Sequence, residues 1–141
     1  MRLILIPLLA IVPALAGCAS TPASRAAAAQ QATDDQVGLR KELAGLVPAE
    51  RGESCLNSID LRNAQAIRNY GPTIVYSLSR SVKYVTTTSG GCDNLDRDIL
   101  VTVSNSGQLC RGDIARTVDR VARFQTGSCS FGDFVRYRRP S

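Results

Sequence analysis

The sequence predicts a mostly β protein, a small antiparallel β-sandwich or open barrel with an N-terminal helix and disulfide bonds. Short β-forming runs separated by Gly, Pro, Asn and Ser clusters fill residues 51–141. Four of the five cysteines lie in the same region. A helical leucine pattern precedes it. The length of 141 residues fits a single folded domain, and the absence of histidine excludes every site that depends on imidazole.

The first 17 residues have the pattern of an export signal. A short basic start, Met1-Arg2, precedes an apolar run over residues 3–15 that is too short to span a bilayer. The run ends in Leu15-Ala16-Gly17-Cys18, which resembles the lipobox of bacterial lipoproteins. The resemblance implies cleavage before Cys18 and acylation of that cysteine. Ala14-Leu15-Ala16 also fits ordinary secretion, so a soluble periplasmic protein stays as the alternative.

The cysteine count favours the lipoprotein. Four cysteines form an even set and Cys18 is left over, and lipidation explains a leftover cysteine in an exported chain. In Gram-negative lipoproteins a residue other than Asp after the cysteine implies delivery to the outer membrane, and here that residue is Ala19. We therefore expect a periplasm-facing protein held in the outer membrane by lipid on Cys18, with the Ala-rich residues 18–32 as a tether.

Residues 33–50 predict a helix and a linker. Thr33 and Gln36 have the spacing of a capping box, and Leu39, Leu43 and Leu46 form an apolar stripe. Pro48 is expected to stop the helix.

Residues 51–141 predict the β domain. Leu78 is expected to face Val82 across a hairpin whose three-residue loop is Ser79-Arg80-Ser81, because only an odd loop puts both apolar sets on one face. Residues 113–123 fit a helix or a strand, and the strand is favoured. The expected strands cover residues 64–68, 73–79, 82–87 and 98–104, where Ile99, Val101 and Val103 share a face, and a closing strand carries Phe131, Phe134 and Tyr137.

The four domain cysteines are expected to form disulfides in an oxidising compartment. Of three possible connectivities we favour Cys92–Cys110 and Cys55–Cys129. A zinc site is disfavoured because the spacing contains no C-x₂-C pair, and neither a metal nor a cofactor is predicted.

The cysteine segments resemble those of a known family. They are Cys55-Leu56-x-x-Ile59-x-Leu61-Arg62, Gly90-Gly91-Cys92, Ser106-Gly107-Gln108-Leu109-Cys110-Arg111-Gly112-Asp113 and Gly127-Ser128-Cys129-x-Phe131-Gly132-Asp133-Phe134. Over about 80 residues they are similar to small proteobacterial envelope proteins classed only as a domain of unknown function. The resemblance implies export and paired cysteines, and it transfers no catalytic residue.

Two groups of acidic residues could carry chemistry. Asp93, Asp96 and Asp98 lack the Gly and distal Glu of a calcium-binding loop and predict a solvated turn. A second group could supply the carboxylate pair of a hydrolase, but its spacing does not bring the residues together; its members are Asp60, Asp113 and Asp133.

The net charge of +5 fits either a solvated basic surface or contact with anionic partners. Arg136, Arg138 and Arg139 at the end of the chain are the candidate anion-binding residues, for lipopolysaccharide phosphates or peptidoglycan carboxylates. Nucleic acid is not an expected partner of an exported lipoprotein. The sequence therefore predicts a non-catalytic structural or interaction module of the cell envelope, with an envelope polymer or protein as partner. An inhibitor of a hydrolase such as lysozyme and an Asp-dependent hydrolase are the alternatives.

Overall fold

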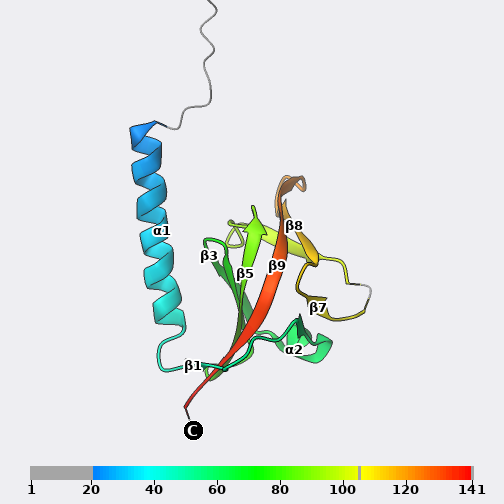
Figure 1. Ribbon diagram of the computed structural model, residues 1–141. Coiled ribbons are helices and arrows are strands. Elements are labelled where there is room, and N and C mark those ends of the chain that lie inside the picture. The colour runs from blue at the N-terminus through cyan, green and yellow to red at the C-terminus, as the bar shows by residue number, and fades with distance from the viewer. Residues whose placement is uncertain (1–20, 105, 141) are drawn as a thin grey trace, which may run out of the picture.

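The computed structural model describes residues 21–104 and 106–140, and it confirms the mostly β class. In the described residues, a curled antiparallel sheet forms an open half-barrel with strand order β3-β4-β5-β9-β8-β6 (Figure 1). These strands are β3 (Ala66–Tyr70), β4 (Thr73–Ser77), β5 (Val82–Gly90), β9 (Gln125–Arg138), β8 (Ile114–Asp119) and β6 (Asp98–Thr102). A two-residue strand, β1 (Val47–Pro48), pairs with the end of β9. The predicted strand over residues 113–123 is therefore present as β8.

The β4–β5 hairpin has the predicted register. Tyr76 lies opposite Tyr84 and Ser77 opposite Lys83. The next pair is Leu78 and Val82, and the Leu78 N–H donates to the Val82 carbonyl at 3.1 Å. Because the loop has three residues, the apolar side chains of both strands share the concave face.

Strand β9 brings two phenylalanines to that face through a β-bulge. Thr86 pairs with Phe134 and Thr88 with Phe131, so three steps along β9 match two along β5. The extra residue lets side chains three apart point to the same side. Gly132 makes the bulge possible, since a Cβ there would lie 2.7 Å from the Thr87 carbonyl oxygen. Both phenylalanines are buried, and their ring centroids are 5.9 Å apart.

The apolar face of β6 points away from the core. Ile99, Val101 and Val103 are exposed, whereas Leu100 packs against the buried cluster. A strand at the edge of the sheet alternates like any other, so placing Leu100 inside puts these three outside.

Helix α1 (Pro22–Glu42) begins eleven residues earlier than Thr33, so the predicted helix start is wrong and residues 22–32 of the predicted tether are helical. Thr21 is the N-cap and accepts from the Ser24 N–H at 3.2 Å, and a proline follows at the first helical position. Alanine has the highest helix propensity, so the Ala-rich run continues the helix. Thr33 lies within it, and its hydroxyl donates to the Ala29 carbonyl. Among the described residues, neither helix has the length and apolar character needed to cross a membrane.

The disulfides join Cys55 to Cys110 and Cys92 to Cys129, so the predicted connectivity is wrong although all four cysteines are paired. Strand β2 (Cys55–Leu56) pairs with β7 (Leu109–Cys110), which places one pair directly opposite each other. In the main sheet Cys129 lies opposite Gly90, two residues before Cys92. The pairing of strands decides which cysteines meet, and the number of residues between cysteines did not predict it.

Helix α2 (Ser58–Asn63) was not predicted. Asn57 caps it by accepting from the Asp60 N–H at 2.8 Å. Strand alternation places α2 at the end of the half-barrel opposite the β3–β4 turn, as Figure 1 shows.

The other end of the half-barrel, called here the loop end, gathers three connections. They are the β3–β4 turn, the loop of residues 91–97 and the β8–β9 turn of residues 120–124. Helix α1 runs parallel to β4, because Asp35 lies beside Gly71 in the β3–β4 turn and Glu42 beside Ser77 at the end of β4. The start of α1 is therefore also at the loop end (Figure 1).

Candidate functional site

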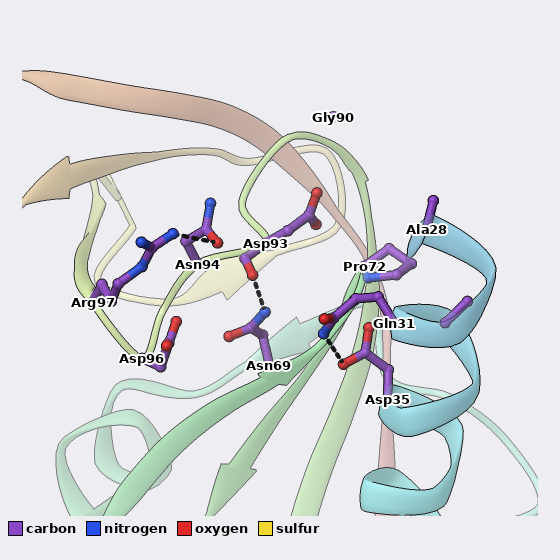
Figure 2. A pocket seen from close by; sticks show the side chains of 12 residues that line it. Ala28, Gln31, Asp35, Asn69, Pro72, Gly90, Asp93, Asn94, Asp96 and Arg97 are labelled. Atoms are coloured by element: carbon purple, nitrogen blue, oxygen red, sulfur yellow. Dashed lines mark hydrogen bonds between the residues drawn. The ribbon is translucent and has the colours of Figure 1, made fainter. Parts of the chain in front are cut away.

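A groove of about 910 Å³ lies between α1 and the loop end of the half-barrel. Figure 2 shows Ala28, Gln31 and Asp35 of α1 on one side and the loop of residues 91–97 on the other, with Asn69 on the floor between them. The groove therefore exists only because α1 is held beside the sheet.

The helix approaches the sheet closely at one glycine. A Cβ on Gly38 would lie 2.6 Å from the Tyr70 ring, so only glycine lets the helix backbone rest on that ring. Four residues later, Glu42 makes an ion pair with Lys83 of β5. Its carboxylate also accepts hydrogen bonds from the Ser77 hydroxyl at 3.2 Å and the Tyr70 hydroxyl at 3.3 Å.

The Glu42 carboxylate is charged in this setting. Burial by itself would raise its pKa, but the hydrogen bond and charge of Lys83, with the Ser77 and Tyr70 hydroxyls, outweigh burial and lower the pKa below 4.5. Lys83 is only 8% exposed, so its ammonium depends on this carboxylate for compensation. The contacts of Glu42 with Lys83, Ser77 and Tyr70 therefore fix the direction of α1 on the convex face of the sheet.

Asn69 holds the loop side of the groove. Its amide donates to the Asp93 carbonyl at 2.6 Å, and its oxygen accepts from the Leu95 N–H at 3.1 Å. On the opposite wall of the groove, within α1, the Gln31 amide donates to the Asp35 carboxylate at 3.2 Å. Figure 2 marks this bond and the bond from Asn69 to Asp93 with dashed lines.

The groove carries a net negative charge. Three of its lining residues are acidic and one is basic, namely Asp35, Asp93, Asp96 and Arg97. Arg97 donates to Asn94 at 3.3 Å. Carboxylates and carboxamides suit a hydrogen-bonding partner that bears positive charge.

The third residue of the predicted acidic turn lies elsewhere. Asp98 is buried in β6 and accepts a hydrogen bond from the Thr126 hydroxyl at 2.5 Å. Across residues 21–104 and 106–140, no three acidic or cysteine side chains are grouped to hold a metal ion.

The basic C-terminal residues lie at the opposite end from the loops. Arg136 and Arg138 share the concave-side face of β9, and the Arg136 guanidinium lies 6.0 Å from the Tyr84 ring centroid. Burial, the hydrogen bond to Asp60 and the charges of Glu53 and Asp60 raise the pKa of Tyr84 to about 12. Asp60 and Glu53 therefore lie near Tyr84 and Arg136, and all three C-terminal arginines, Arg136, Arg138 and Arg139, are exposed.

The three aspartates considered for hydrolysis have separate local partners. Asp60 accepts from the Tyr84 hydroxyl at 3.0 Å, Asp113 from the Cys110 N–H at 2.8 Å, and Asp133 pairs with Arg111 at 3.4 Å. These contacts are typical of groups that stabilise caps and turns. Cys18, the predicted lipidation site, lies outside the described residues.

The groove was not predicted from the sequence. Asn69 and Glu42 belong to ordinary polar stretches, and their roles depend on contacts with residues 24 or more positions away. Gly38 was the available signal, since a glycine inside an alanine-rich helix marks a close approach.

The fold and the groove together define a disulfide-linked β half-barrel with a long N-terminal helix docked along one face. No family model, curated protein or solved structure matches the chain.

Proposed function

We propose that the protein is an outer-membrane lipoprotein of the bacterial envelope whose β domain is a non-catalytic interaction module. The observation that carries the proposal is the position of α1. The helix begins at Pro22, four residues after Cys18, and is locked to the sheet by Glu42 and Lys83. Lipid on Cys18 would thus be coupled to the domain through a helix about 31 Å long, with only residues 19–21 between Cys18 and the helix.

The groove supplies the binding surface of this module. Its carboxylates and carboxamides favour a basic, hydrogen-bonding segment of an envelope protein. An anionic polymer suits the groove poorly, so any such polymer is assigned to Arg136, Arg138 and Arg139 at the opposite end.

Anchoring is tested by Cys18→Ser in the native envelope. The variant is expected to remain unprocessed or to be released from the membrane fraction, because an acylated cysteine is the proposed anchor. Unchanged membrane partitioning together with an unchanged mature mass would refute it.

Binding in the groove is tested by crosslinking in the envelope with Asp93→Asn/Asp96→Asn. The double variant is expected to lose a crosslinked partner protein that the wild-type chain captures. Asp133→Asn is the matched control, since Asp133 is exposed and lies outside the groove. Equal crosslinking by all three proteins would exclude the groove as the binding surface.

A further inference from the structure

The β8–β9 turn carries two exposed apolar side chains that lie outside the buried core. Val121 is 91% exposed and Phe124 is 58% exposed. Two apolar side chains this exposed on one short turn form a small apolar surface that a bilayer or a partner can cover. Arg120 and Arg123 alternate with them along the same turn.

The turn has a defined shape. The Asp119 carboxylate accepts hydrogen bonds from the Val121 N–H at 2.8 Å and the Ala122 N–H at 2.6 Å. The Asp119 N–H donates to the Phe124 carbonyl at 3.0 Å. The apolar residues are therefore presented by a fixed turn.

The turn is tied to the loop end of the domain. The Arg120 guanidinium donates to the carbonyls of Leu95 and Asp98 at 3.4 and 3.3 Å. Leu95 belongs to the loop that faces Ala28 of α1 across the groove. From Ala28 to Pro22 the helix rises about 9 Å, so the turn lies near the level at which α1 begins.

Helix α1 begins at this end, so Cys18, which precedes it in the sequence, is linked to the same end of the domain. Cys18 precedes Pro22 by four residues, so it lies within roughly 14 Å of Pro22 even along a fully extended chain. A bilayer that holds lipid on Cys18 would face the loop end. Apolar residues flanked by arginines suit the bilayer interface, where the rings and aliphatic groups enter the acyl boundary and guanidiniums reach phosphates.

We propose that the β8–β9 turn is a second membrane contact, in which Val121 and Phe124 enter the interface of the bilayer that anchors Cys18. The proposal rests on the proposed lipid anchor and adds an orientation to it. The docked helix would hold the domain with its loop end towards the lipid, while the opposite end with Arg138 and Arg139 would face away.

The test uses the full chain in vesicles of phosphatidylethanolamine and phosphatidylglycerol, some with acyl chains brominated near the interface. The protein has no tryptophan, so Phe124→Trp and Val121→Trp each introduce a single tryptophan, whose emission is excited apart from that of the four tyrosines. Both are expected to show blue-shifted emission in vesicles, with intensity reduced by roughly half by brominated lipid. Ile59→Trp is the matched control, because Ile59 is 62% exposed on α2 at the opposite end, and it is expected to stay unquenched.

Each outcome decides between the two proposals. Membrane-bound protein with unquenched emission from both turn variants would overturn the second contact and leave the anchor intact. Protein that does not partition into the vesicles when Cys18 is present would overturn the anchor. A blue shift without quenching by brominated lipid would overturn the membrane contact in favour of a second copy of the chain covering the turn.

Discussion

Removing the charge of Glu42 tests whether the ion pair with Lys83 holds α1 on the sheet. In Glu42→Gln the amide oxygen still accepts a hydrogen bond from the Ser77 hydroxyl, but the NH2 group in place of the second oxygen cannot accept from Tyr70, and the Lys83 ammonium is left beside a neutral group. A hydrogen bond to a charged group contributes about 1.5–3 kcal/mol, and breaking a fully buried ion pair costs about 3–5 kcal/mol. The side chains of Glu42 and Lys83 retain 17% and 11% exposure, so water compensates part of the loss. We expect the free energy of unfolding at pH 7 to fall by about 1.5–3 kcal/mol.

The assay is urea unfolding, combined with hydrogen exchange of the α1 amides so that undocking of the helix is detected separately from global unfolding. Arg68→Gln is the matched control. Arg68 lies 3.9 Å from the same carboxylate but its side chain is 65% exposed, and exposed pairs contribute about 0–1 kcal/mol. The double variant Glu42→Leu/Lys83→Met is expected to be more stable than the sum of its single changes predicts, because it leaves no uncompensated charge.

The pH dependence of the free energy of unfolding is an independent test of the ion pair. The folded-state pKa of Glu42 is lowered, so its stabilising contribution is present above pH 4.5 and is lost as pH falls through the folded-state value. Glu42→Gln should flatten the stability curve in that acidic range. A variant whose free energy of unfolding is within about 0.5 kcal/mol of wild type, with unchanged pH dependence and unchanged exchange in α1, would refute the role of the ion pair in docking α1.

Three further experiments test the fold and the basic C-terminal end. Gly127→Ala should destabilise the domain by several kcal/mol, because its Cβ would lie 1.8 Å from the Gly91 carbonyl oxygen, whereas Gly91→Ala meets nothing within 4 Å and should be near neutral in thermal unfolding. Peptide mapping of the non-reduced protein should recover the two disulfide pairs of the structure, and mixed pairs would contradict the strand pairing. Arg136→Gln/Arg138→Gln should weaken retention on lipopolysaccharide at low salt and lose the difference at moderate salt, because exposed charges are screened over about 8 Å; equal retention at both salts would leave solubility as their role.

Local patterns were sufficient for the β class and much of its detail. The hairpin register followed from loop parity, since a shift of one residue would have opposed Leu78 to Lys83. The four domain cysteines were correctly expected to pair. The strands at β3, β4, β5, β6, β8 and β9 also lie where composition and alternation placed them, within a few residues.

The start of α1 was misplaced because two local signals competed. Thr33 and Gln36 match a capping box, but Thr21 and Pro22 supply an equally good start, and alanine lets the helix continue between them. The short-range sequence pattern does not favour Thr33 over Thr21 as the start of the helix. The contacts of Gly38 with Tyr70 and of Glu42 with Lys83 stabilise the later part of the helix, which both starts share, so the extension back to Pro22 follows from the Thr21 cap and from alanine propensity.

The sequence by itself determined what depends on neighbours along the chain: the period of the strands, the parity of the loop, the caps and the number of cysteines available to pair. Only the tertiary structure decided which cysteines meet, which face of β6 is exposed, and where the groove and the β8–β9 turn lie relative to α1. These features join residues tens of positions apart, such as Asn69 with Asp93 and Glu42 with Lys83. Their proximity follows from sheet order and from burial of one face, and residue spacing contains no record of either.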